Sequence, residues 1–140
     1  MNILFLCKGN VGRSQMAEGL FKKLYPDKAD VFSAGTQLSG QEQTLESLKP
    51  GTDYVIAVMS EEGIDVSKNI RKTITDIALH PKDTTTKVVY INTDELPELL
   101  LNDDRVIQWN IEDPKGMSLE DTRKIRNEIK AKVIELGNSI

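Results

Sequence analysis

The amino-acid sequence predicts an α/β domain built on a parallel β-sheet. Short apolar runs alternate along the chain with longer stretches in which apolar residues recur at helical spacing. Strands that are separated by helices in this way are typical of crossover connections, which make neighbouring strands parallel. No repeat or linker divides the 140 residues, so we expect residues 1–140 to form a single domain around one core.

The expected elements can be assigned in chain order. Strands are predicted at residues 3–6, 31–33, 87–91 and 105–109. A first helix is predicted to begin at Ser14 and to end before Pro26. A last helix is predicted after Ser118, with Asp121 in a near capping box. Residues 54–59 have the composition of a strand, but the residues after them are typical of a helix end, so pattern alone leaves this segment open.

Composition excludes several classes of protein. The residues are 39% apolar and 29% charged, as in soluble globular proteins, and no apolar run is long enough to span a bilayer. Because the N-terminus lacks the features of a signal peptide, we expect a cytoplasmic protein with no membrane partner. A net charge of −4 argues against a nucleic-acid binder. The single cysteine excludes an internal disulfide and a four-thiolate zinc site. We also expect the protein to be a monomer.

The clearest chemical signal follows the first strand. It is the segment Cys7-Lys8-Gly9-Asn10-Val11-Gly12-Arg13-Ser14. The segment resembles the nucleotide-binding loop GxxxxGK[ST], which leads from a strand into a helix and binds phosphate with backbone N–H groups. Here Cys7 replaces the first glycine and Arg13 replaces the lysine. Because an arginine fork suits two oxygens of one tetrahedral group, residues 8–13 are predicted to bind an oxyanion above the thiol.

Cys7 is predicted to be a nucleophile. A helix N-terminus and a guanidinium both favour the thiolate of a nearby cysteine, and the thiolate is the reactive form. Ser14 can donate a hydrogen bond to that thiolate and assist its departure. We therefore expect attack on phosphorus and a phosphocysteine that water hydrolyses. An isolated cysteine after an apolar strand is more often structural, but the glycines, arginine and serine of this loop outweigh that alternative.

Such a reaction needs a general acid to protonate the leaving group and a base to activate water. Asp113 is the candidate because it follows the fourth strand, at the sheet edge where Cys7 lies, and because Pro114 stiffens its loop. The negative charge of thiolate and phosphate favours a protonated carboxyl there. An Asp-Pro pair is usually only a turn, and Glu112 and Asp94 are rivals on this evidence.

These residues resemble a known family, the low-molecular-weight protein tyrosine phosphatases and their arsenate reductase relatives. The matching segments are the loop with Met16-Ala17-Glu18, then Ser33-Ala34-Gly35-Thr36, Glu62-Gly63-Ile64-Asp65-Val66-Ser67, and Trp109 with Asp113-Pro114. The resemblance implies a three-layer α/β fold. Its central four-stranded parallel sheet is flanked by helices, and the phosphate-binding loop joins strand 1 to helix 1. It also implies that residues 54–62 are helical and that Asp113 is the general acid and base.

The resemblance further implies how the loop is supported. Asn10 and Ser33 correspond to residues that brace the loop backbone. In some arsenate reductases the positions matching Asn10, Glu18, Ser33 and Asp65 surround a potassium ion, and their oxygen ligands are all present here. The same residues serve equally well as a hydrogen-bond brace, and we expect no required cofactor.

Departures from the family pattern bear on the reaction. Thioredoxin-coupled arsenate reductases relay oxidation through two further cysteines, which this chain lacks. Val11 favours a tyrosine phosphatase over an arginine phosphatase, which has threonine there. Gly12 stands where many relatives carry a second loop cysteine. Lys115-Gly116-Met117 replaces the aromatic residues that commonly follow the Asp-Pro; Lys8 and Lys115 attract anionic substrates or are simply solvated.

Three functions remain open in a definite order. The first is a phosphomonoester hydrolase of the tyrosine-phosphatase type, acting on a phosphorylated protein or a small phosphomonoester. The second is a single-cysteine arsenate reductase that takes arsenate and uses an external thiol such as glutathione. The third is an inactive oxyanion-binding module. Trp109 is expected in the core rather than in the site, and His80 has no predicted role.

Overall fold

A four-stranded parallel sheet forms the centre of the molecule in a computed structural model, which describes residues 1–37, 43–74 and 86–140. The strands are β1 (Asn2–Cys7), β2 (Asp30–Gly35), β3 (Thr86–Ile91) and β4 (Val106–Trp109). They lie in the order β2-β1-β3-β4, and each neighbouring pair is parallel. The predicted fold class is confirmed, and all four strands lie at the predicted places.

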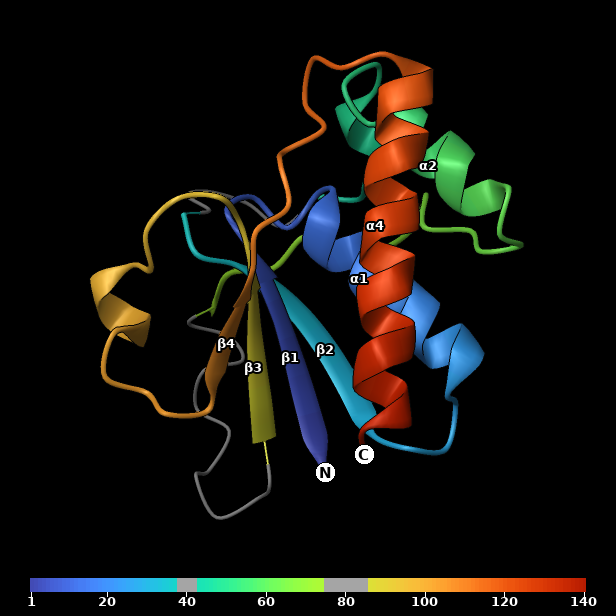
Figure 1. Cartoon of the computed structure of the whole chain (residues 1–140). Helices are drawn as coiled ribbons and strands as arrows, with labels where there is room; N and C mark the ends of the chain where they lie inside the picture. Colours follow the sequence, from blue (N-terminus) through green and yellow to red (C-terminus); the bar gives the residue numbers. More distant parts are fainter. Residues whose placement is uncertain (38–42, 75–85) are drawn as a thin grey trace.

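Three helices cover one face of this sheet (Figure 1). They are α1 (Arg13–Leu24), α2 (Asp53–Ser60) and α4 (Leu119–Asn138), and two short 3-10 helices are η1 (Glu46–Leu48) and η2 (Glu98–Leu100). The helix that the family resemblance implies at residues 54–62 is confirmed by α2, against its strand-like composition. The cap of α4 is also confirmed, because Ser118 Oγ accepts a hydrogen bond of 3.1 Å from the Asp121 N–H. No described helix is both long and apolar enough to cross a membrane.

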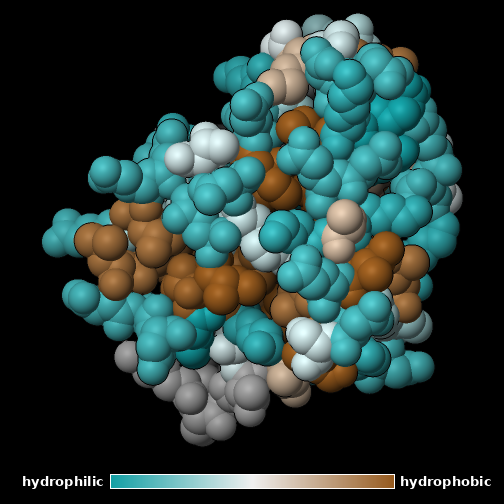
Figure 2. All heavy atoms as spheres, in the orientation of Figure 1, coloured by the Kyte–Doolittle hydropathy of each residue, from teal (hydrophilic) through white to brown (hydrophobic). Residues whose placement is uncertain are grey.

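Apolar side chains fill both faces of the sheet. On the helical face, Phe5 packs against Phe21 and Trp109, with ring centroids 6.3 and 5.7 Å apart. Trp109 is only 6% exposed, so its expected place in the core is confirmed. On the other face, Leu6 and Tyr90 belong to a smaller buried cluster that includes Leu100 of η2. Figure 2 shows apolar atoms reaching the surface on the side where η2 and β4 lie.

An ion-pair cluster joins the end of α2 to α4. Glu61, which follows α2, accepts hydrogen bonds from Arg123 and Arg126 of α4, with N–O distances of 2.6–3.2 Å. The hydrogen bond from Arg123, followed by that from Arg126, lowers the pKa of Glu61 from 4.5 to about 2. Arg126 is buried and also donates to the Val58 carbonyl of α2 at 2.9 Å. The cluster therefore fixes the position of α2, which lines the site.

Candidate active site

The loop between β1 and α1 is shaped by one residue of unusual backbone conformation. Asn10 has a φ of 53°, in the left-handed region that asparagine tolerates better than most residues. The turn at Asn10 lets the chain reverse from the end of β1 into α1, where the Met16 N–H bonds the Gly12 carbonyl at 2.9 Å. Since α1 begins at Arg13, the first amides of the helix face the end of β1. The predicted phosphate-binding loop therefore lies between strand 1 and helix 1.

Cys7 lies at the floor of this loop. Its side chain is buried, and its Sγ is 3.0 Å from Ser14 Oγ, the hydrogen bond that the sequence predicts. Arg13 is also buried; its Nη1 donates to the Ile111 carbonyl at 3.0 Å. Its Nη2 lies 3.8 Å from Asp113 Oδ2. The four predicted catalytic residues are thus brought together from two ends of the sequence.

Asp113 is held in place by its own loop. Its Oδ1 accepts a hydrogen bond of 3.0 Å from the Lys115 N–H, while the side chain stays 53% exposed. Pro114 is buried against the phosphate-binding loop: a Cβ on Gly12 would lie 3.5 Å from Pro114 Cγ. Of the described residues that line the adjoining cavity, Asp113 is the one carboxylic acid. The geometry favours Asp113 over the rival Glu112.

The other rival, Asp94, is paired elsewhere. Its Oδ2 lies 2.8 Å from Lys8 Nζ. The hydrogen bond and charge of Asp94 raise the pKa of Lys8, and the same two contributions from Lys8 lower the pKa of Asp94. Both side chains are about half exposed, so solvent screens the pair. The Lys8 ammonium is therefore paired with Asp94 at the rim of the site, while the backbone of Lys8 remains part of the loop.

A buried hydrogen-bond network braces the loop from behind. Asn10 Nδ2 donates to Ser14 Oγ at 2.8 Å and to Ser33 Oγ at 3.0 Å. Ser33 Oγ donates in turn to Glu18. Asn10 and Ser33 are therefore in contact behind the loop. Asp65 accepts instead from the Ser67 N–H at 2.9 Å, and hydrogen bonds from Ser67 lower its pKa.

Three further residues of this network are not predicted by the sequence analysis. Gln15 is fully buried, and its Nε2 donates to Asn10 Oδ1 at 3.1 Å. Asn69 Nδ2 donates to Gln15 Oε1 at 3.1 Å, and the Lys72 N–H donates to Asn10 Oδ1 at 2.8 Å. The one available signal was the place of Gln15 directly after the loop, beside Ser14. Asn69 and Lys72 lie in a polar segment without any pattern that points to the loop.

Gly35 and Arg71 also support the loop. A Cβ at Gly35 would lie 2.7 Å from the Lys8 carbonyl oxygen, so the end of β2 can approach the loop only because position 35 is glycine. Arg71 Nε donates to the Gly9 carbonyl at 3.2 Å. The sequence marks Gly35 as part of a family segment but gives no reason for Arg71.

The loop opens into a cavity of about 690 Å³. The described residues that line it are Cys7, Lys8, Gly9, Val11, Gly12, Arg13, Gln37, Leu48, Gly51, Thr52, Tyr54, Val55, Arg71, Asp113, Pro114, Lys115, Gly116, Met117 and Thr122. Tyr54, near the start of α2, supplies an aromatic ring to this wall. Tyr54 is not predicted from the sequence, because the family resemblance led us to expect aromatic residues only after Asp113-Pro114. His80 lies outside the described residues.

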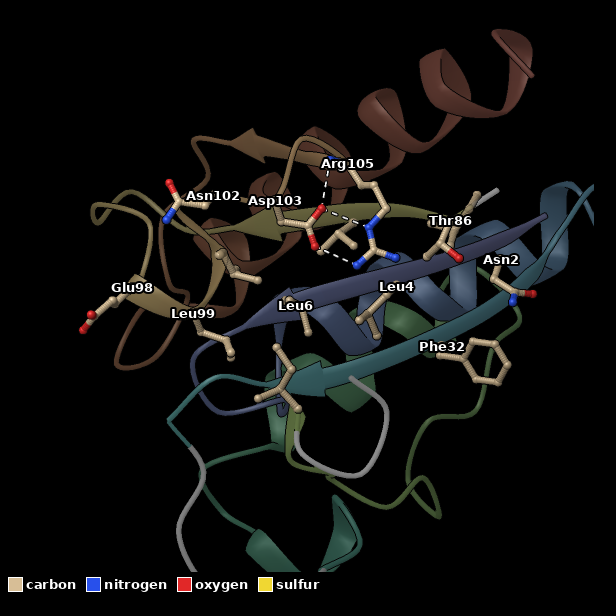
Figure 3. Close-up of a pocket in the computed structure, with 14 residues that line it drawn as sticks. Asn2, Leu4, Leu6, Phe32, Thr86, Glu98, Leu99, Asn102, Asp103 and Arg105 are labelled. Atoms are coloured by element: carbon tan, nitrogen blue, oxygen red, sulfur yellow. Dashed lines mark hydrogen bonds and ion pairs between the residues drawn. The ribbon is translucent and has the colours of Figure 1, made fainter. Parts of the chain in front are cut away.

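A second cavity, of about 340 Å³, lies against the strands on the opposite face of the sheet. Leu4, Leu6 and Phe32 line it, with the ion pair between Asp103 and Arg105 at its edge (Figure 3). Its described lining residues include neither Cys7 nor Arg13. The cavity over Cys7 is therefore the candidate active site.

Known proteins resemble this chain over nearly its whole length. The family of the low molecular weight phosphotyrosine protein phosphatase matches residues 2–140. Arsenate reductase 1 of Staphylococcus epidermidis is 33% identical over 94% of this chain and 91% of its own length. A glutaredoxin arsenate reductase of Synechocystis is 33% identical over 96% and 94%, respectively.

Solved structures of arsenate reductases and of a phosphatase share this fold over nearly the whole chain. An arsenate reductase in the phosphate binding state is 33% identical, with a TM-score of 0.77 over 99% of this chain and 98% of that chain. A low molecular weight protein tyrosine phosphatase from T. tengcongensis is 26% identical, with a TM-score of 0.75 over 100% and 99%. On this evidence, the chain belongs to the low molecular weight phosphotyrosine protein phosphatase family.

Proposed function

We propose that the protein hydrolyses phosphomonoesters through a phosphocysteine on Cys7. The observation that carries this proposal is the meeting of Cys7, Arg13 and Asp113 at one cavity. A nucleophile, an oxyanion clamp and a carboxylic acid are the groups that phosphoryl transfer to a thiol requires. The absence of a second cysteine from the sequence leaves a hydrolase as the simplest use of this site.

The reaction follows from the geometry in two steps. Loop amides and the Arg13 guanidinium bind the phosphoryl oxygens, and the Cys7 thiolate attacks phosphorus. Asp113 gives its proton to the leaving oxygen as the P–O bond breaks. Asp113, now ionised, then takes a proton from water, which attacks phosphorus and breaks the P–S bond. Ser14, 3.0 Å from Sγ, stabilises the departing thiolate.

The cavity wall supports an aryl phosphate as substrate. Tyr54 and Val55 of α2 and Met117 of the loop after Asp113 contribute apolar surface to the lining of the cavity. A volume of about 690 Å³ suits a ligand much larger than a phosphate ion. Tyr54 thereby replaces the aromatic residues that the segment after Asp113 lacks, which strengthens the proposal of a tyrosine-type phosphatase.

A second candidate function is arsenate reduction with an external thiol. Supporting it are the relatives, at 33% identity, that are arsenate reductases, one of them a glutaredoxin arsenate reductase. Cys7 would attack arsenate, and an external thiol would then bond to the Cys7 sulfur as arsenite leaves. Two thiols are oxidised to a mixed disulfide while As(V) is reduced to As(III), and a second external thiol releases Cys7.

One set of assays separates these functions. The protein is given phenyl phosphate and 4-nitrophenyl phosphate, and separately arsenate with glutathione, with and without glutaredoxin. We expect hydrolysis of both esters, no turnover in Cys7→Ser, and a loss of roughly 10²–10⁴-fold in Asp113→Asn. The loss should be larger for phenyl phosphate, because phenolate needs a proton more than nitrophenolate does. Thiol-dependent arsenite formation without ester hydrolysis would favour the reductase, and phosphate binding with neither activity the inactive module.

Potassium binding at Asn10, Glu18, Ser33 and Asp65 remains a separate proposal. In its favour, Glu18 and Asp65 line a common cavity of about 620 Å³ behind the loop. Against it, Glu18 already contacts the ammonium of Lys22 and the hydroxyl of Ser33. If potassium binds, KCl will raise the melting temperature more than NaCl at equal ionic strength, and Asp65→Asn will remove the difference. Equal melting temperatures in the two salts would leave only the hydrogen-bond brace.

A further inference from the structure

Arg71 places a second guanidinium at the cavity over Cys7. It lies in the segment after Ser67, far in sequence from the phosphate-binding loop, yet it lines the same cavity. Its Nη2 would lie 3.4 Å from a Cβ on Gly9, so the guanidinium packs directly on the loop. Arg71 is only partly buried, and a molecule in the cavity can therefore reach it.

The guanidinium of Arg71 is only partly used within the protein. Its Nε donates to the Gly9 carbonyl. Among the described residues, neither Nη atom has a hydrogen-bond or ion-pair partner. The other cations near the loop are engaged differently, because Arg13 contacts Ile111 and Asp113, and Lys8 is paired with Asp94. Arg71 is thus a held cation beside the phosphoryl site, and no described residue occupies its Nη donors.

We propose that Arg71 forms a subsite for a carboxylate of the substrate, so that acidic phosphopeptides are the preferred substrates. This inference rests on the proposed phosphatase function. An arginine whose Nε is already held presents its two Nη groups in a set direction, and such a fork binds a carboxylate with little loss of side-chain freedom. The apolar residues around Tyr54 would contact the phenyl ring of phosphotyrosine. Arg71 would bind the carboxylate of the neighbouring residue in the peptide.

The cavity volume agrees with a substrate of this kind. Phosphate alone fills only a small part of about 690 Å³, whereas a phosphotyrosine and one neighbouring side chain occupy far more. An acidic neighbour also needs a local cation, because the whole chain carries a net charge of −4 and does not attract anions by itself. Lys115, which follows Asp113 and lines the same cavity, offers a charge that is more exposed than that of Arg71.

Two phosphotyrosine peptides test the subsite. They are identical except that the residues flanking phosphotyrosine are glutamate in one and glutamine in the other. For the unaltered protein we expect kcat/KM to be about tenfold higher for the glutamate peptide, as for one hydrogen bond to a charged group. Arg71→Gln should bring this ratio close to one, and Arg71→Lys should restore part of it. Lys115→Gln is the matched control, since it removes a cavity charge and should keep most of the preference.

The ratio of kcat/KM for the two peptides distinguishes binding of the substrate carboxylate by Arg71 from support of the loop by Arg71. If Arg71 only holds the Gly9 carbonyl, Arg71→Gln will slow both peptides equally, and an unchanged ratio overturns the proposal. Equal losses of preference in Arg71→Gln and Lys115→Gln would also overturn it, because they would indicate a general charge effect. Peptide binding to the Cys7→Ser variant, measured by calorimetry, tests the subsite even if no peptide is hydrolysed. A tighter Kd for the glutamate peptide that depends on Arg71 would support the subsite while the proposed hydrolysis failed.

Discussion

At the scale of single residues, the isolation of Cys7 has a chemical consequence. Cys7 is the one cysteine in the sequence, so a sulfenic acid formed there has no neighbouring thiol with which to make a disulfide. Further oxidation then leads to sulfinic and sulfonic acids, which mild thiols do not reduce. We predict that peroxide inactivates the protein and that dithiothreitol restores only part of its activity after prolonged exposure. Phosphatase assays before and after thiol treatment measure this.

The matched variant for this prediction is Gly12→Cys. A Cβ at position 12 would make only ordinary contacts, 3.5 Å or more from Pro114 and Val55, so the loop accepts a cysteine there. This variant places a second sulfur in the loop, and its activity should recover further with dithiothreitol than that of the unaltered protein. Full recovery of the unaltered protein would contradict the prediction.

Gly35 carries a second prediction at this scale. In Gly35→Ala the new methyl group would meet the Lys8 carbonyl at 2.7 Å and the Gly9 carbonyl carbon at 3.1 Å, and both are backbone atoms of the phosphate-binding loop. Since backbone cannot rotate away, we expect a loss of about 1–3 kcal/mol of stability and weaker inhibition by phosphate. Chemical unfolding and phosphate inhibition measure the two effects.

Gly51→Ala is the control for Gly35→Ala. Its methyl group would lie 3.4 Å from the Leu48 carbonyl, an ordinary contact, and the free energy of unfolding should change little. Similar destabilisation in both variants would show that loss of a glycine, and not the approach of β2 to the loop, is responsible.

At the scale of elements, the connection between α2 and α4 depends on pH. The pKa of Glu61 is lowered from 4.5 to about 2, chiefly by the hydrogen bond from Arg123. A lowered pKa in the folded state means that the charged carboxylate stabilises the fold above pH 4.5 and that this contribution disappears as the pH falls towards 2. We predict that Glu61→Gln lowers the melting temperature at pH 6 to 7 and that the difference from the unaltered protein shrinks between pH 4.5 and 2.

Glu120→Gln provides the comparison for this cluster. Glu120 pairs with Arg123 within α4 itself, so it does not connect two helices, and its loss should change the melting temperature less. Thermal unfolding followed by circular dichroism across this pH range decides the matter. A constant difference between Glu61→Gln and the unaltered protein at all pH values would contradict the assigned pKa.

The elements also indicate what sequence patterns can and cannot predict. β1, β3 and α1 are predictable because the two strands are buried, mainly apolar runs and α1 has a regular apolar stripe. Residues 53–60 are not, because β-branched residues there suggest a strand while tertiary contacts with α4 make them helical. Only the family resemblance predicted this helix correctly.

At the scale of the whole molecule, the site divides into a local part and a distributed part. Cys7, Arg13 and Ser14 can be predicted because they lie in one short segment, residues 7–14, whose pattern is typical of an oxyanion-binding loop with a nucleophile. Asp113 follows from the rule that parallel strands end at one edge. Tyr54 and Arg71 reach the same cavity from elements whose positions only the folded chain defines, so no spacing in the sequence points to them.

The central claim is that Cys7 carries the phosphoryl group during turnover, and trapping that intermediate tests it most directly. Asp113→Asn should slow hydrolysis of the intermediate, because it removes the base that activates water. The variant is mixed with 4-nitrophenyl phosphate, quenched within the first turnover and digested, and the peptide that contains Cys7 is weighed by mass spectrometry. We predict one added phosphoryl group on that peptide, and none on the corresponding peptide of the Cys7→Ser, Asp113→Asn double variant. Steady hydrolysis of the ester without any modification of Cys7 would contradict the account.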